Sequence, residues 1–197
     1  MTDRKKKTNA PSLGGKRRAK KSGLEPGLSR YHHPQRTVTF GGLMELLHTP
    51  YVHSRFRAVL ALADFADHDG AVAALIRSLG DDSVLVRLAA IFALGQIGPR
   101  ISNPMLSEQA TVLLAAFLDR ESKLIIPSVA IRVLLGLPQS GPESSASLAF
   151  DERLTGLSAE GQTPIVHLSE FAAEALQKIG TLEAAAALDA WREHPRQ

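Results

Sequence analysis

Residues 81–98 read DDSVLVRLAAIFALGQIG, and this stretch decides the fold. Its apolar positions step by 3, 1, 3, 1 and 3 residues along the chain, at Val86, Ala89, Ala90, Ala93, Leu94 and Ile97. That spacing places them on one face of an α-helix. Asp81 to Ser83 offer side-chain oxygens for the N-terminal cap, and Gly98 followed by Pro99 stops the helix. The stretch therefore predicts an amphipathic helix with defined ends.

The same helical face recurs along the chain. It returns 82 residues later, at Leu168, Phe171, Ala172, Ala175, Leu176 and Ile179. Halfway between the two, the matching positions are Pro127, Ala130, Ile131, Leu134, Leu135 and Pro138. A shorter match lies 30 residues upstream, at Phe56, Arg57, Val59, Leu60 and Ala63. Self-similarity at a spacing of 30–41 residues indicates an array of stacked helical units.

Partner helices are expected between these segments, over Asp69–Leu79, Met105–Leu118, Leu43–His48 and Glu183–Trp191. Pro138–Thr163 reads as an irregular loop around Gly141 and Pro142, with a helix from Ala146 to Leu154 as the alternative. No segment alternates like a strand for long enough to predict a sheet. The expected fold class is all-α.

Residues 86–98 resemble a HEAT repeat of the short bacterial kind, the type also found in phycobilisome lyases. Residues 171–180 resemble the same consensus, and the resemblance extends from about Phe40 to Trp191. It implies a right-handed α-α superhelix, a short HEAT-like solenoid of about four helical hairpins. It also implies protein partners, because such arrays present an extended surface lined by the second helix of each pair.

In that family an Asp and an Arg near the start of the second helix form a ladder between repeats. Asp82 and Arg87 match this pair, and Arg57 matches the Arg alone. The later repeats depart from the pattern, with Ser128 and Ser169 at the Arg position. The resemblance therefore implies a structural ladder of Asp82, Arg87 and Arg57 that is incomplete.

Charge divides the chain into two expected parts, a disordered basic arm over residues 1–36 and a HEAT-like repeat domain over residues 37–197. The arm has a charge balance of +9 and the remainder −6, which gives the net +3 of the chain. The arm contains almost no apolar residues to bury, so it cannot recover the entropy lost on ordering. Its basic residues are candidate polyanion-binding groups, namely Arg4, Lys5, Lys6, Lys7, Lys16, Arg17, Arg18, Lys20 and Lys21. A localisation signal, a membrane-surface patch and a solubilising tail are the alternatives.

No residue pattern indicates catalysis, and we expect no catalytic residues, no metal and no cofactor. The chain has no cysteine, and its seven histidines do not follow a metal-binding spacing. Asp64, Asp67 and Asp69 are better explained as capping residues of the next helix than as a carboxylate cluster. Trp191 is expected to pack against the last hairpin.

These observations favour a non-catalytic scaffold that binds another protein and contacts a polyanion through residues 1–36. A DNA- or rRNA-associated protein is the alternative, and a bilin-lyase-like or DNA-glycosylase-like enzyme is a minor one. No apolar run reaches the roughly 18–20 residues of a membrane span, and no apolar segment of a signal peptide follows the basic N-terminus. The expected location is the cytoplasm, and the oligomeric state stays open.

Overall fold

The computed structural model describes residues 39–118, 123–125, 144–157 and 165–193, all of which belong to one unit, residues 34–197. The described residues form eight α-helices: α1 Phe40–Leu46, α2 Val52–Leu62, α3 Asp69–Ser78, α4 Val84–Ile97, α5 Pro104–Leu118, α7 Ser145–Leu157, α8 Leu168–Ile179 and α9 Leu182–Glu193. The shorter elements are the 3-10 turns η1 Ala63–Phe65 and η2 Gly98–Arg100 and the strands β1 Lys123–Ile125 and β2 Ile165–His167. The basic arm expected over residues 1–36 lies outside the described residues.

Local sequence explains where several helices begin and end. The side chains of Thr39, Asn103 and Ser144 accept hydrogen bonds from backbone N–H groups in the first turns of α1, α5 and α7. Each bond satisfies one of the N–H groups that a helix start leaves unpaired. Helix α8 ends at Gly180, whose φ of 69° lies in the left-handed region that only glycine adopts without strain.

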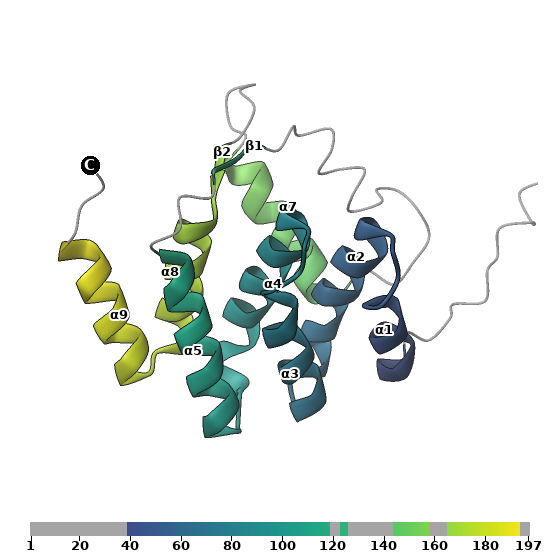
Figure 1. The fold of residues 1–197 in the computed structure, drawn as a ribbon, viewed down its shortest axis with the longest axis horizontal. Coiled ribbons are helices and arrows are strands. Elements are labelled where there is room, and N and C mark those ends of the chain that lie inside the picture. Colours follow the sequence, from purple (N-terminus) through teal and green to yellow (C-terminus); the bar gives the residue numbers. More distant parts are fainter. Residues whose placement is uncertain (1–38, 119–122, 126–143, 158–164, 194–197) are drawn as a thin grey trace, which may run out of the picture. The chain divides into compact units, whose positions relative to one another are not determined.

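The helices form a solenoid of antiparallel pairs, α1 with α2, α3 with α4, and α5 with α8 (Figure 1). The second helices α2, α4 and α8 pack in one row, and the first helices α3, α5 and α9 pack in another. The apolar core lies between the rows, with Leu60, Leu75 and Leu94 among its fully buried side chains. The expected all-α solenoid is confirmed, and the described residues contain three complete pairs followed by α9. None of the described helices is long and apolar enough to span a bilayer.

Helix α8 packs directly against α4, although 82 residues separate their matching positions. A Cβ atom placed on Gly95 would lie 3.0 Å from the Ala175 Cα atom, and one on Gly98 would lie 2.6 Å from the Ile179 Cγ1 atom. No helix fits between surfaces this close. The expectation that the helical face over Pro127–Pro138 stacks between α4 and α8 is therefore wrong. That segment lies outside the described residues.

The third pair, α5 and α8, is thus interrupted by an insertion. Strand β1 follows α5 and β2 precedes α8, and the two pair antiparallel with Lys123 opposite His167 and Ile125 opposite Ile165. We call this two-stranded sheet the neck of the insertion, residues 126–164. The sequence did not predict it, because three residues are too short to display a recognisable alternation.

Helix α7 lies within the insertion, so the irregular loop expected over Pro138–Thr163 is wrong for Ser145–Leu157. The alternative, a helix from Ala146 to Leu154, is confirmed and extends further at its C-terminal end. In Figure 1, α7 crosses behind α4 and α2, against the row of second helices.

We expect Gly95→Ala to destabilise the protein by about 1–2 kcal/mol. Alanine favours a helix over glycine by about 1 kcal/mol, but overpacking against Ala175 costs about 1–3 kcal/mol. Gly156→Ala is the matched control, because its Cβ would meet no atom within 4 Å, and it should raise the melting temperature or leave it unchanged. Urea denaturation of both variants measures the difference. A Gly95→Ala variant as stable as the wild type would contradict the close contact between α4 and α8.

Candidate functional site

Aromatic side chains gather on the face of the second helices that α7 covers. Phe56 of α2, Phe92 of α4 and Phe171 of α8 lie on this face, which we call the inner groove. Phe150 of α7 inserts between the first two, with ring centroids 5.5 Å from Phe56 and 5.0 Å from Phe92. Both contacts are edge-to-face, at 71° and 80°, an arrangement that aromatic pairs prefer. The inner groove therefore holds the ring of Phe150 in a specific orientation.

Helix α7 presents one apolar stripe to the inner groove. Ala146, Phe150 and Leu154 are only 3%, 1% and 2% exposed, and their spacing of four residues keeps them on one side of the helix. On the opposite side Leu148 is 53% exposed, and Glu152 is also exposed. This is the pattern of an amphipathic helix laid into a hydrophobic groove.

Polar contacts hold the two ends of α7. At the N-terminal end the Ser145 hydroxyl donates to the Asp64 carboxylate over 2.5 Å. Near the C-terminal end Arg153 forms a bidentate pair with Glu174 of α8, and its guanidinium lies 5.3 Å from the centre of the Phe171 ring. The side chains of Arg153 and Glu174 are 32% and 39% exposed, so water screens the pair. The pair fixes the orientation of α7 more than it stabilises the fold.

A second polar cluster ties α2 to the start of α4. Arg55 donates two hydrogen bonds of 2.9 Å to the Asp81 carboxylate and a third, of 3.0 Å, to the Thr49 carbonyl. The Asp81 carboxylate also accepts a 2.8 Å bond from the backbone N–H of Ser83. Arg87 donates to the backbone carbonyl of Asp81 over 2.7 Å. The cluster thus links the first two pairs and the loop between α1 and α2.

This cluster differs from the ladder that the resemblance implied. Arg55 and Asp81 form the ion pair in place of Arg57 and Asp82, and Arg87 contacts the backbone carbonyls of Asp81 and Asp82. Arg57 is exposed because two residues turn a helix by about 200°, which directs its side chain away from Arg55. The bond from Ser83 orients the Asp81 carboxylate toward α2.

The ion pair shifts the pKa values of both partners. Burial acts to raise the pKa of Asp81, but the hydrogen bonds from Arg55 and Ser83 and the charges of Arg55 and Arg87 together bring it below its ordinary value. The hydrogen bond to Asp81 raises the pKa of Arg55, against the opposing effect of burial. Both groups therefore stay charged in the folded protein at neutral pH.

The acidic side chains expected to cap helices have other partners. His68 and Ser83 occupy the N-cap positions of α3 and α4, and neither side chain caps its helix. Asp69 accepts a 2.8 Å bond from Asn103, and Asp64 accepts the bond from Ser145. The expected capping by these carboxylates is wrong, because groups brought close by folding compete for them.

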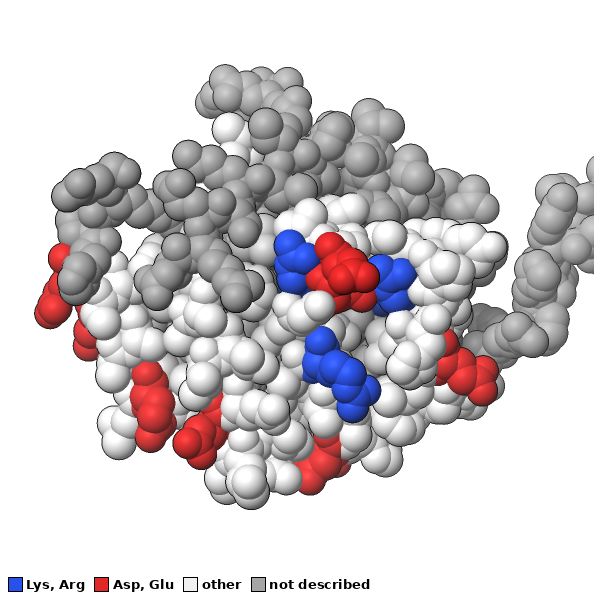
Figure 2. All heavy atoms as spheres, in the orientation of Figure 1, with Lys and Arg blue, Asp and Glu red and all other residues white. Residues whose placement is uncertain are grey.

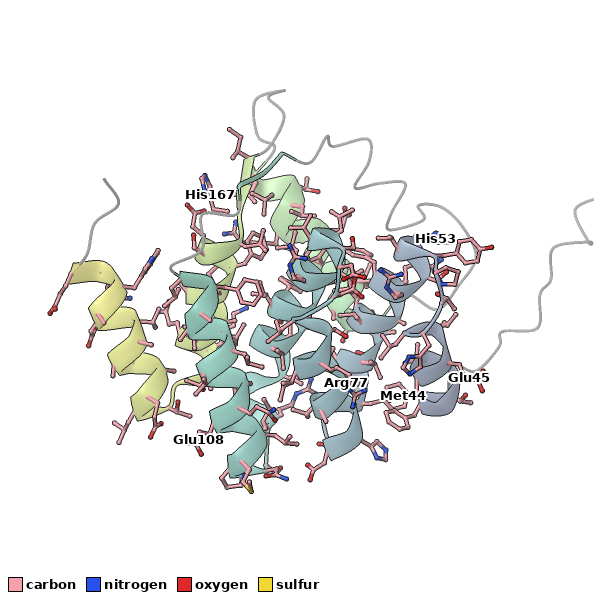
Figure 3. All side chains as sticks on the ribbon, viewed as in Figure 1. Met44, Glu45, His53, Arg77, Glu108 and His167 are labelled. Carbon is pink, nitrogen blue, oxygen red and sulfur yellow. The ribbon has the colours of Figure 1, made fainter. Side chains whose placement is uncertain are left out.

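The remaining candidates lie apart from the inner groove or outside the described residues. His53 and His167 lie near the starts of α2 and α8 (Figure 3). No group of three His, Cys, Asp or Glu side chains that could hold a metal occurs within the described ranges. Trp191 is half-buried against the core, as expected. All nine basic candidates of the arm, Arg4 to Lys21, fall outside the described residues.

The outer face, formed by the first helices, is chemically different. Figure 2 shows it mostly uncharged, with acidic groups along its lower part. Its exposed apolar side chains include Met105 and Val112 of α5 and Leu182 of α9.

Sequence reasoning missed the inner groove as an occupied site. The signal was the spacing of Ala146, Phe150 and Leu154 after a Ser144 cap. The nearby Gly141-Pro142 and the serine-rich composition favoured a loop instead.

A family model of HEAT repeats matches residues 42–135. The match begins within α1 and covers α2 to α5. A comparison with curated proteins gave no match.

Asp81→Asn should cost about 1–3 kcal/mol of stability at neutral pH, because Arg55 loses its charged partner. The folded pKa of Asp81 is lowered, so its contribution is present above the unfolded value of about 3.9 and is lost as the pH falls through the folded pKa. The deficit of the variant relative to the wild type should therefore shrink below about pH 4. Urea denaturation between pH 7 and pH 3 measures it.

Asp82→Asn is the matched control, since it removes the same charge from the neighbouring position. We expect little change in stability. A deficit of Asp81→Asn that stays constant down to pH 3 would contradict the charged pair.

Proposed function

Because this chain is a HEAT-repeat protein over residues 42–135, we propose that it is a non-catalytic interaction protein that binds another protein through its solenoid surface. Arrays of this kind expose a continuous surface formed by one helix of each repeat. The observation that supports the proposal is the inner groove, in which Phe56, Phe92 and Phe171 come from three successive second helices. Aromatic side chains in such pockets carry much of the energy of protein interfaces.

The charges around the inner groove favour a protein over a polyanion at this face. Asp64 lies at one end of the α7 contact and Glu174 at the other. Carboxylates repel phosphate groups and attract basic side chains of a partner. Any polyanion is therefore assigned to another part of the chain.

The second half of the proposal assigns polyanion contact to residues 1–36. Their nine clustered basic residues would neutralise phosphates and release counterions, which gives affinity without sequence preference. We place the protein in the cytoplasm, where such an arm meets nucleic acid. The alternative function, association with DNA or rRNA, rests on the same residues.

Affinity purification of the tagged full chain, with and without nuclease, tests protein binding. We expect one protein, identified by mass spectrometry, to be retained in stoichiometric amount after nuclease treatment. Phe92→Asp, which places a charge in the inner groove, should abolish its retention, and Val112→Asp on the outer face is the matched control. Loss of all partners after nuclease treatment would favour the nucleic-acid alternative.

Binding of a 20-base-pair duplex at increasing salt tests the arm. Replacing Arg17, Arg18, Lys20 and Lys21 with Gln should weaken binding and reduce the salt slope by about 3–4, since each phosphate contact contributes about 0.9. The control variant carries Arg57→Gln and Arg77→Gln, two exposed positions of the described body. Equal binding by both variants would contradict the role of the arm.

A further inference from the structure

Helix α7 fills the inner groove, but the helical stack does not depend on it. The second helices contact one another directly, α2 with α4 and α4 with α8. The α4–α8 contact is made at Gly95 and Gly98, where the two helices are close enough to exclude any other element. The three helix pairs are therefore complete without α7.

The neck separates the insertion from the stack mechanically. Ile125 and Ile165 are paired across β1 and β2, so the insertion leaves and re-enters the solenoid at one point. The ends of α5 and α8 stay joined whether or not α7 is docked. Helix α7 thus contacts the solenoid as a tethered ligand would.

We propose that the inner groove is the docking site for an amphipathic helix of a partner protein, and that α7 is the resident helix which the partner replaces. This inference rests on the proposed function and specifies the partner. The groove is never left empty, because the withdrawal of α7 would expose Phe56, Phe92 and Phe171 together, and an aromatic patch of that kind needs to be covered.

The contacts of α7 define what the partner helix carries. A small residue, an aromatic residue and an aliphatic residue stand at positions i, i+4 and i+8, as Ala146, Phe150 and Leu154 do. A basic residue at i+7 pairs with Glu174, as Arg153 does. A hydroxyl at i−1 donates to Asp64, as Ser145 does.

The docking of α7 is weak enough for exchange, because three apolar side chains anchor it and its ion pair is partly exposed. Its tether nevertheless gives it an effective concentration of the order of millimolar, so an external helix must compete with it. Weakening the resident anchor therefore increases the apparent affinity for an external helix. An external copy of α7 has the required chemistry and serves as the probe.

The test measures fluorescence anisotropy of a labelled peptide of residues 143–158 with the full chain. Phe150→Ala in the chain should increase its affinity for the wild-type peptide at least ten-fold over the wild-type chain, because the weakened α7 no longer competes. Leu148→Ala, on the exposed side of the same helix, is the matched control and should bind like the wild type. Unchanged affinity in a Phe150→Ala chain that retains its helical circular dichroism would overturn the proposal.

A charge exchange gives a second readout that does not depend on the folding of Phe150→Ala. The Glu174→Lys chain should prefer a peptide carrying Arg153→Glu over the wild-type peptide, and the wild-type chain should show the opposite preference. Equal binding of both peptides to both chains would overturn the assignment of the groove. This result is distinguishable from failure of the proposed function, since purification with Phe92→Asp is a separate measurement.

Sedimentation of the wild-type chain tests whether the partner is a second copy. We expect a monomer at micromolar concentration. A dimer that the wild-type peptide dissociates would overturn the assignment to a different protein, because α7 of one copy would then occupy the groove of the other.

Discussion

The close contact between α4 and α8 is the constraint on which the rest of the structure depends. Gly95 and Gly98 carry no side chain at the points where the backbone of α8 approaches, so the two helices meet without a gap. Because a row of packed helices admits no element between such neighbours, α8 completes the third pair with α5. Everything between these two helices is consequently placed outside the stack, and α9 extends the row of first helices.

That arrangement gives the insertion its significance. An insertion at the neck emerges where α8 begins, beside the face formed by the second helices, and α7 folds back onto this face. The ring of Phe150 is held by edge-to-face contacts with Phe56 and Phe92, and carboxylates flank the contact at both ends. The face through which a helical array meets its partners thus already carries a helix, which indicates the chemistry that the face accepts.

Periodicity and capping residues predicted the existence, type and approximate bounds of most helices, because burial of one helical face leaves its spacing in the sequence. Asn103 before α5 and Gly180 after α8 were readable for the same reason, since both satisfy local backbone geometry. The site was less predictable. Arg55 rather than Arg57 reaches Asp81, because the side chain that faces the next repeat depends on how far each helix is rotated about its axis.

The sequence by itself determined that this chain is an all-α repeat protein with an acidic body and a basic N-terminal segment, because helical faces and charge are properties of residues close together in the chain. Only the tertiary structure decided that the helical face 82 residues after the first one is its direct neighbour. It also decided that residues 126–164 form an insertion and that Phe150 completes the inner groove. These features depend on contacts between distant residues, whose free energies compare alternative packings that the sequence pattern alone does not distinguish.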